Sequence, residues 1–327
     1  MKVALFSIRK YEQEQFEKAN VALHDLKFFQ ERLTPHTVEA ARGCKAVCCF
    51  ANDQVNKEVI LKFKEFGVKL IALRSAGYNH VDLEAAKAAE IPVVRVPNYS
   101  PNAVAEHAVA LLLCLNRKVH RAFNRVREFN FSLEGLVGFD LNGKTVGVIG
   151  AGRIGKVFCQ IMAGFGCKVL VFDKERDPSL EVIATYVELN RLLVESDIIS
   201  LHVPLTPSTR HIVDQRAFDL MKSQVIIINT GRGALIDTRA LIKSLKAKKI
   251  GGAGLDVYEE EEGVFFRDLS DRGVDDDQLA RLLTFPNVLV TAHQAFLTRE
   301  ALREIVETTL TNLTNLEINH DLQHRVV

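Results

Sequence analysis

The sequence lacks the charge excess and the long apolar run that would direct it to nucleic acid or into a membrane. Its 42 lysines and arginines balance 41 aspartates and glutamates, which leaves a formal net charge of +1. Such a chain has no overall field that attracts a polyanion. The apolar run at residues 108–115 is far shorter than the roughly 20 residues that span a bilayer. We therefore expect no nucleic-acid partner and no membrane partner.

The sequence also lacks a secretory signal, a disulfide framework and a metal-ligand spacing. The apolar residues 3–8 end at Arg9 and Lys10, and no small-residue cleavage site follows them. The cysteines have no framework spacing and lie within apolar runs, as is typical of buried free thiols in a reducing compartment. They are Cys44, Cys48, Cys49, Cys114, Cys159 and Cys167. We expect a cytoplasmic protein without a structural metal.

Short apolar runs alternate with amphipathic stretches in the first part of the chain. At 327 residues, with 47% hydrophobic and 25% charged residues, about two globular domains are expected. Strands are predicted at residues 2–8, 46–50, 69–73 and 93–96, and helices at 56–66 and 83–89. This alternation indicates a parallel sheet covered by helices. The loop 74–79 directly follows a strand, where an open α/β sheet places ligand loops.

Residues 145–173 have the order strand, glycine turn, helix, strand and acid, which is typical of a dinucleotide-binding unit. Gly150 permits the tight turn, Gly152 lets the backbone approach a pyrophosphate, and Gly155 lets the helix pack on the strand. The helix N-terminus offers unpaired N–H groups to the anion. Asp173 can accept hydrogen bonds from the ribose hydroxyls and would repel a 2′-phosphate, so NAD is favoured over NADP. The expected apolar stripe of the helix is Val157, Ile161 and Phe165.

The alternation continues to the end of the chain and predicts a second α/β domain. Strands are expected at residues 146–149, 169–172, 198–203, 225–229, 254–257 and 288–291, and helices near 189–195 and 239–247. A helix from Ala103, capped by Asn102, precedes this sheet. A final helix after Thr298 is surplus to it and is expected to return to the first domain. The predicted fold is α/β with two doubly wound parallel-sheet domains and a cleft between them. They are a flavodoxin-like substrate domain of residues 1–98 plus 299–327 and a Rossmann NAD domain of residues 99–298.

A basic cluster follows the helix from Ala103. Its members are Arg117, Lys118, Arg121, Arg125 and Arg127. The cluster has two interpretations, a nucleic-acid patch and a solvated helix face. The balanced total charge favours the solvated face.

Four predicted strand ends in the second domain carry polar side chains. These are His202, Arg232, Asp256 with the acidic run 259–262, and His293. Because the carboxyl ends of parallel strands line the ligand crevice, these groups are expected to converge. An arginine is a two-pronged donor suited to a carboxylate, and a histidine is an acid/base group that titrates at about pH 6.5. With a hydride carrier, these groups suit the reduction of a 2-oxo acid.

Spacing alone leaves three points open. Arg232 could be a surface ion-pair partner, and His293 could be a satisfied structural histidine. The member of the run 259–262 that faces the histidine is also undetermined.

Six motifs in the same order resemble the D-isomer-specific 2-hydroxyacid dehydrogenases. They are VPNYSPNAVAEHAVALLL (96–113), GKTVGVIGAGRIGKV (143–157), HVPLTPST (202–209), INTGRGALID (228–237), GLDVYEEEE (254–262) and TAHQAFLT (291–298). The resemblance covers nearly the whole chain. It implies a triad of catalytic residues, Arg232, Glu261 and His293, in which the glutamate partners the histidine. NYSPNAVAEHA, HQAFLT and the long acidic and aromatic insert between Glu259 and Phe285 point to the lactate branch of the family.

The resemblance also implies the ligand contacts. The expected contacts with NAD are Gly150, Gly152, Arg153, Ile154, Gly155, Asp173, Val203, Pro204, Thr209, Thr230, Gly231 and Asp256. The substrate carboxylate is expected at Arg232 and at the backbone N–H groups of Ala76 and Gly77. The expected pocket walls are Phe50, Tyr99 and Phe296. Family members are usually dimers packed through the cofactor domain, so a homodimer or dimer-based homo-oligomer is expected, with the helix from Ala103 as the contact.

The activity implied by the resemblance is the reversible reduction of pyruvate to D-lactate, with hydride from NADH and a proton from His293. One alternative is reduction of a branched, aromatic or phosphorylated 2-oxo acid by the same triad. A phosphorylated acid is disfavoured because the loop 74–79 offers one obvious cation, Arg74. The other alternative is a non-catalytic NAD(H)-sensing regulatory protein, which the complete triad disfavours.

Overall fold

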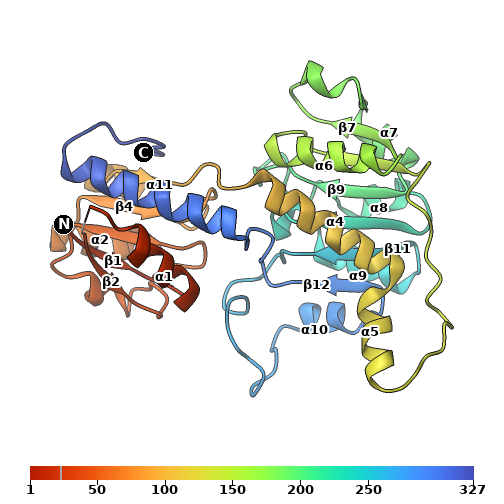
Figure 1. The fold of residues 1–327 in the computed structure, drawn as a ribbon, viewed down its shortest axis with the longest axis horizontal. Coiled ribbons are helices and arrows are strands. Elements are labelled where there is room, and N and C mark those ends of the chain that lie inside the picture. The colour runs from red at the N-terminus through yellow and green to blue at the C-terminus, as the bar shows by residue number, and fades with distance from the viewer. Residues whose placement is uncertain (23) are drawn as a thin grey trace. The chain divides into compact units, whose positions relative to one another are not determined.

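The structure of the protein, a computed structural model, describes residues 1–22 and 24–327 and consists of two compact units. The first unit comprises residues 1–100 and 296–327, and the second comprises residues 101–295. These limits lie two or three residues from the expected ones. The chain therefore leaves the first unit, builds the second and returns, and both termini belong to the first unit (Figure 1).

The described residues of the first unit form one sheet of five parallel strands. In sequence, the strands are β1 (Lys2–Leu5), β2 (Asp25–Phe28), β3 (Ala46–Cys49), β4 (Leu70–Leu73) and β5 (Val93–Val94). Their spatial order is β2-β1-β3-β4-β5, which is the flavodoxin-like arrangement. The helices of this unit are α1 (Lys10–Ala19), α2 (Lys57–Phe66), α3 (Leu83–Ala89) and α11 (Arg299–Glu317), with a 3₁₀ turn η1 (Val38–Ala41).

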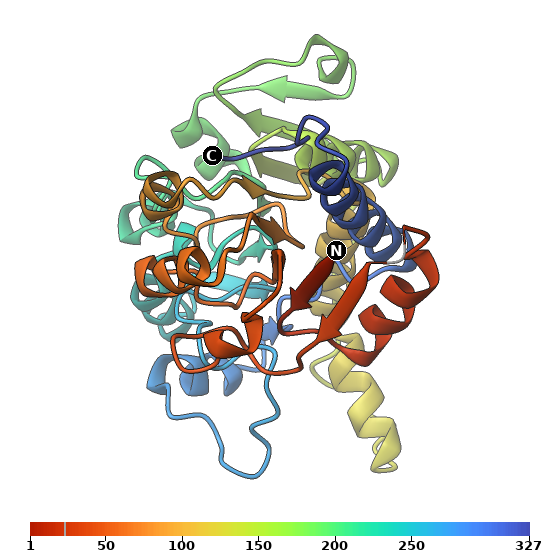
Figure 2. The same cartoon turned by 90° about the vertical axis from the view of Figure 1, so that its left-hand side faces the viewer.

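Helices cover both faces of this sheet because successive strand residues point to opposite sides. Val3 and Leu5 of β1 belong to a core cluster shared with Phe16 of α1 and with α11. Ala4, between them, belongs to the cluster that contains α2 and α3. The C-terminal helix α11 therefore covers part of one face of a sheet whose strands lie in the first hundred residues (Figure 2).

The second unit, residues 101–295, is described throughout and holds one sheet of seven parallel strands. They are β6 (Thr145–Ile149), β7 (Lys168–Phe172), β8 (Ala184–Tyr186), β9 (Ile198–Leu201), β10 (Val225–Asn229), β11 (Ile250–Leu255) and β12 (Val288–Val290). The spatial order β12-β11-β10-β9-β6-β7-β8 reverses direction at β6, as in the Rossmann fold with one strand added. Its α-helices are α4 (Pro101–Arg117), α5 (Val119–Arg127), α6 (Arg153–Gly164), α7 (Leu189–Glu195), α8 (Gln215–Leu220), α9 (Thr238–Lys246) and α10 (Asp277–Leu283). Two 3₁₀ turns, η2 (Pro178–Leu180) and η3 (Gly233–Leu235), complete it.

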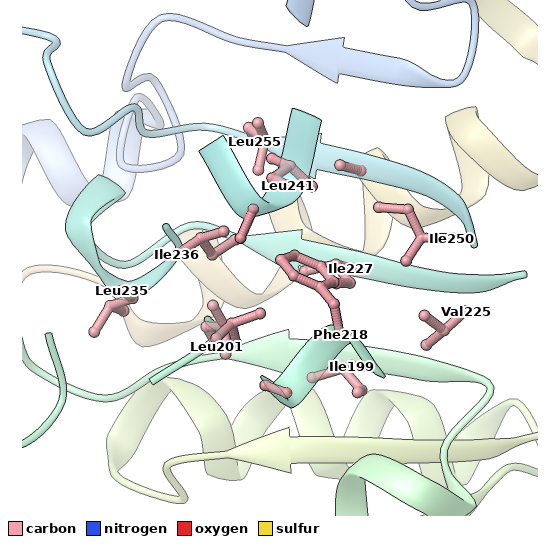
Figure 3. Packing of buried hydrophobic residues seen from close by; sticks show 14 of the residues in the cluster. Ile199, Leu201, Phe218, Val225, Ile227, Leu235, Ile236, Leu241, Ile250 and Leu255 are labelled. Carbon is pink, nitrogen blue, oxygen red and sulfur yellow. The ribbon is translucent and has the colours of Figure 1, made fainter. Parts of the chain in front are cut away.

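Both faces of this sheet are buried under helices. On one face Phe218 of α8 and Leu241 of α9 share a core with Ile199, Ile227 and Leu255 of the neighbouring strands β9, β10 and β11 (Figure 3). The other face is covered by α4 and α6. Strands buried on both faces are held rigidly, so the loops at their ends have defined positions.

The structure contains helices that were not predicted, α1, α8 and α10, and differs from the predicted elements in three further places. Strands β2 and β8 were not predicted, because both are edge strands with partly exposed residues. Helix α4 begins at Pro101, so Asn102 lies in its first turn and is not the cap; proline suits that position because its missing N–H would be unpaired there. In α6 the fully buried positions are Gly155, Phe158, Cys159 and Met162. Of the expected stripe, Val157 and Ile161 are partly buried and pack against this core, whereas Phe165 is exposed.

The remaining structural expectations concern cysteines, membranes and metals. All six cysteines are free, and five are buried. Within residues 1–22 and 24–327, no helix combines the length and the apolar character needed to cross a bilayer. The same residues contain no group of three or more His, Cys, Asp or Glu side chains placed to hold a metal ion.

Candidate active site

Three neighbouring strands of the second unit end at the same edge of the sheet. The register pairs Asn229, the last residue of β10, with Leu255, the last residue of β11, and Leu255 in turn with Val290 of β12. The loops after these strands carry Arg232, Glu261 and His293 respectively. The sheet therefore places all three loops side by side, as expected from the strand-end positions.

The closest contact among these groups joins His293 and Glu261. Nδ1 of the histidine lies 3.0 Å from Oε1 of the glutamate, and the two side chains are 19% and 28% exposed. The Phe266 ring packs near the imidazole, with ring centroids 5.8 Å apart. A carboxylate on Nδ1 orients the ring and fixes which nitrogen faces Glu261. Nε2 has no hydrogen-bond partner in the described protein and remains available to a ligand.

The structure also separates the members of the acidic run. Glu259 is engaged elsewhere: its carboxylate lies 2.6 Å from His211 Nε2, accepts a 3.1 Å hydrogen bond from the Thr238 hydroxyl and lies 3.3 Å from Arg210. Glu261 is therefore the member whose carboxylate contacts His293. Sequence spacing left this point open, and only the resemblance indicated Glu261.

The turn that carries His293 is held by Asp256, the residue after β11. His293 has the left-handed φ of +52°, which costs free energy for a residue with a side chain, and its N–H donates to the Asp256 carbonyl at 2.7 Å. The Asp256 carboxylate accepts hydrogen bonds from the Thr291 hydroxyl (2.6 Å) and from the N–H groups of Gln294 and Ala295 (2.9 Å each). Burial alone would raise the pKa of Asp256, but these hydrogen bonds and His107 hold it below its ordinary value.

Arg232 follows a turn closed by Asn229, whose side chain accepts from Gly231 N at 3.0 Å and donates to the Arg232 carbonyl at 2.9 Å. A side chain at Gly233 would lie 2.0 Å from the Tyr258 carbonyl, so this turn packs directly on the loop that leads to Glu261. The guanidinium donates to the Gly231 carbonyl at 2.7 Å. Among the described residues it has no acidic partner, which argues against a surface ion pair and leaves it available to an anion.

The glycine turn after β6 has the geometry of a phosphate cradle. Gly150 has φ +95°, and a Cβ there would lie 2.7 Å from the His202 backbone. A Cβ at Gly155 would lie 2.0 Å from the Gly150 carbonyl oxygen, whereas one at Gly152 would meet no protein atom within 4 Å. The turn is therefore closed toward the protein and open at Gly152, beside the N-terminus of α6 that begins at Arg153. A pyrophosphate fits this arrangement.

Asp173 lies at the end of β7, next to the glycine turn. Its carboxylate accepts hydrogen bonds from Ala151 N at 2.5 Å and from Glu175 N at 3.1 Å. These contacts orient an acidic group at the position where the adenosine ribose is expected. Lys156 donates to Asp177 at 2.7 Å, which ties the loop after β7 to helix α6.

The other expected cofactor contacts fall into two groups. The first group can contact a ligand directly. Thr230, after β10, has a buried hydroxyl without a partner in the described protein, as suits a ligand contact. Gly231 and Ile154 are partly exposed, and Arg153 is exposed. Val203 and Pro204 follow β9 and are accessible, but the Thr209 hydroxyl donates to the Pro204 carbonyl at 2.6 Å and accepts from Thr206 N. Thr209 and Asp256 therefore shape their loops, and both side chains are buried.

His202 is the one polar strand end that lies beneath the glycine turn. Its Nε2 is 2.9 Å from the Ser200 hydroxyl, and its ring packs on Phe158 with centroids 5.0 Å apart. Burial lowers the pKa of His202 to about 3, so the ring is neutral at physiological pH. It supports the turn and does not join the triad.

In the first unit, three aromatic side chains of the expected substrate pocket form a cluster. The Phe296 ring lies 5.9 Å from the Phe50 ring and 6.3 Å from the Tyr99 ring, between centroids. Asp53 fixes the loop of Phe50 by accepting a 2.7 Å hydrogen bond from its N–H. Burial raises the pKa of Asp53, although Phe50 N–H and other donors oppose this.

The loop after β4 presents backbone donors but no accessible cation. Ala76 and Gly77 have N–H groups that, among the described residues, donate to no protein acceptor. The Arg74 side chain is fully buried and lies 3.3 Å from Glu12. The cation expected from the sequence is therefore used internally, whereas the partly exposed Arg95 donates to the Ala76 carbonyl of this loop at 2.8 Å.

Sequence reasoning missed three residues that support this site. Asn229 and Thr291 end or follow strands β10 and β12, so their polar character at those positions was a usable signal. His107 lies within α4, where a single histidine in an apolar helix carries no such signal, yet its Nε2 is 3.1 Å from the Thr291 hydroxyl oxygen.

Comparison with known proteins identifies the class. The family described as D-isomer specific 2-hydroxyacid dehydrogenase, NAD binding domain, matches residues 109–295. The D-lactate dehydrogenase of Escherichia coli (strain K12) is 50% identical over 319 residues, which cover 97% of each chain. The chain belongs to the D-isomer-specific 2-hydroxyacid dehydrogenase family. It is an NAD-dependent D-2-hydroxyacid dehydrogenase.

Solved structures agree over the whole chain. The apo structure of the Escherichia coli D-lactate dehydrogenase has a TM-score of 0.91 at 48% identity and is covered completely, as is this chain. The pyruvate reductase of Chlamydomonas reinhardtii has a TM-score of 0.94 at 42% identity, with 99% of this chain and 98% of that chain covered. A D-lactate dehydrogenase with NAD⁺ from Lactobacillus jensenii has a TM-score of 0.84 at 33% identity, with full coverage of both chains.

Proposed function

We propose that this protein reduces pyruvate to D-lactate with NADH, and that the reaction is reversible. The observation that carries the proposal is the 3.0 Å contact between Glu261 and His293, on loops packed beside an arginine without an acidic partner. The relatives named D-lactate dehydrogenase and pyruvate reductase support pyruvate as the substrate.

When bound, NADH would supply the hydride that reduces the carbonyl carbon of the 2-oxo acid. Arg232 holds the substrate carboxylate through its two-pronged guanidinium, with the N–H groups of Ala76 and Gly77 as further donors. His293 gives its Nε2 proton to the carbonyl oxygen as that oxygen gains charge. Glu261 keeps the ring oriented through its contact with Nδ1. The product is the 2-hydroxy acid, and the histidine takes a proton back from solvent.

The cofactor is assigned to the loops around the glycine turn. The pyrophosphate is placed at Gly150, Gly152, Gly155 and the N-terminus of α6, and the ribose at Asp173. The remaining proposed contacts are Arg153, Ile154, Val203, Pro204, Thr209, Thr230, Gly231 and Asp256. Two of these, Thr209 and Asp256, act through the loops that they hold, since their side chains are buried.

Substrate size is assigned to the aromatic cluster of Phe50, Tyr99 and Phe296. Its bulk favours a small side chain on the 2-oxo acid, such as the methyl group of pyruvate. We test this with NADH consumption on pyruvate, branched and aromatic 2-oxo acids, followed by chirality of the product. Fast turnover of pyruvate to D-lactate is the expected result, and a Phe50→Ala variant should shift preference toward longer acids. Faster turnover of a bulkier acid by the wild type would retain the mechanism and overturn the proposed substrate.

We also propose a homodimer or a dimer-based homo-oligomer, with α4, the helix expected as its contact, and the apolar arm that follows α4 as the interface. The apolar arm is α5 with the segment that follows, residues 119–137; no residue of α5 is buried, and the helix extends beyond the sheet and its covering helices (Figure 2). Its large exposed apolar residues are Val119, Phe123, Val126, Phe129, Phe131, Leu133 and Val137, with exposed fractions of 50% to 84%. So large a patch is typical of a protein interface.

The expected location is the cytoplasm, which suits the free thiols.

A further inference from the structure

His107 contacts the network that holds the His293 turn, although it lies on a different element. It belongs to α4, and its side chain is 20% exposed. Nε2 lies 3.1 Å from Thr291 Oγ1 and 3.4 Å from Asp256 Oδ1. Both partners lie in the loops after β12 and β11, so this histidine joins the helix to two of the three loops of the triad.

The hydrogen-bond directions in this network are determined by its acceptors. The ionised Asp256 carboxylate can only accept, so the Thr291 hydroxyl donates its single proton to it, at 2.6 Å. The same hydroxyl oxygen can then only accept from His107, which requires the proton on Nε2. His107 therefore donates to Thr291, and the same N–H lies near the Asp256 carboxylate.

Asp256 transmits this constraint to His293 through the backbone. Its carboxylate accepts from the N–H groups of Gln294 and Ala295, and its carbonyl accepts from that of His293. These bonds hold a turn whose left-handed residue is otherwise disfavoured. A carboxylate with fewer donors would be less firmly oriented, and the turn would gain conformational freedom.

We propose that His107 is a positioning residue for His293: through Thr291 and Asp256 it holds the turn that presents the imidazole to Glu261. This inference rests on the proposed function, in which His293 supplies the proton. His107 contacts neither His293 nor Glu261. Its effect is therefore on the orientation of His293, the proposed proton donor, and not on the proton transfer itself. If His107 served only to fill space, a side chain of similar volume without a donor would replace it.

The first test compares two substitutions that differ in this respect. His107→Leu keeps most of the volume and removes the donor; His107→Gln keeps a donor on a side chain of similar reach. In His107→Leu we expect kcat to fall by about 10- to 100-fold, with unchanged NADH affinity. His107→Gln should restore most of the rate, and Glu106→Gln, an exposed neighbour on the same helix, should leave it unchanged. Wild-type kcat in His107→Leu, or equal losses in the leucine and glutamine variants, would overturn the proposal.

The second test does not need turnover. In protein labelled with ¹⁵N-histidine, the Nδ1–H signal of His293 is assigned by its disappearance in His293→Gln. We expect this signal to shift and broaden in His107→Leu and in Thr291→Val, but not in Thr291→Ser, which keeps the hydroxyl. An unchanged signal in the first two would overturn the positioning role. Absence of turnover in the wild type with any 2-oxo acid would instead overturn the proposed function, while this signal still reports the turn.

Discussion

His293 has one ring nitrogen on Glu261 and the other without a protein partner in the described chain, so each can be tested separately. We expect His293→Gln to lower kcat by about 1,000-fold, as for loss of a general acid. Glu261→Gln keeps a hydrogen-bonding group but removes the charge, and should lower kcat by a smaller factor, on the order of 10- to 100-fold. NADH titration followed by fluorescence should give unchanged affinity in both variants. Near-wild-type turnover in His293→Gln would remove the proton-donor assignment.

The buried ring of His202 predicts how the stability of the protein depends on pH. Burial lowers its pKa to about 3 in the folded protein, whereas an unfolded histidine titrates at about 6.5. Between these values the unfolded chain binds the extra proton, so stability is fully present above pH 6.5 and is lost as pH falls toward 3. Acidification from pH 7 to pH 5 should cost about 2 kcal/mol through this residue.

The measurement is urea unfolding at both pH values in the wild type, in His202→Gln and in His320→Gln, an exposed control. The glutamine at position 202 can still bond to Ser200 but cannot titrate. On acidification from pH 7 to pH 5, His202→Gln should therefore lose about 2 kcal/mol less stability than the wild type. The same loss in all three proteins would contradict the assignment.

At the scale of elements, substitutions at two glycines of the turn after β6 test a packing contact and a ligand contact separately. Gly155→Ala forces a methyl group against the Gly150 carbonyl and should destabilise the protein by about 1–3 kcal/mol or more. Gly152→Ala meets no protein atom, so its stability should be unchanged. Its NADH affinity should nevertheless fall on the order of tenfold, about 1.4 kcal/mol, because the methyl group occupies the approach of the pyrophosphate. Calorimetric titration and thermal unfolding separate the two effects, and unchanged NADH affinity in Gly152→Ala would contradict the placement.

Buried strands and capped helices were predictable from the sequence because their signals are local. Asn56 caps α2 and Thr298 caps α11 through their side chains, and fully apolar runs such as β3 mark central strands. The edge strands β2 and β8 have no such run, because one side of each faces no neighbouring strand. Residue spacing could not predict which glutamate faces His293, since Glu259 and Glu261 differ only in what the folded loops bring to them; only the resemblance indicated Glu261.

At the scale of the whole molecule, the apolar arm predicts self-association. Phe123→Glu with Phe129→Glu places two charges in the exposed apolar surface, and should convert the proposed oligomer to smaller species in size-exclusion chromatography with light scattering. Val182→Glu is the matched control, because Val182 is 88% exposed in the same unit but lies outside the arm. A wild-type protein that is monomeric at micromolar concentration would contradict the proposal.

The return of α11 to the first unit determines the order in which the protein can be completed during synthesis. The sheet of residues 1–100 needs α11 to cover Val3 and Leu5, and its strand β5 is paired by the last residues, where Val326 N donates to the Val93 carbonyl at 2.7 Å. Ribosomes add about 5–20 residues per second, so the 195 residues of the second unit separate these parts by roughly 10–40 s. The second unit is continuous and can finish folding in that interval. The unit that leaves the ribosome first is thus the last to complete its core, and part of one apolar face of its sheet stays uncovered until α11 is made.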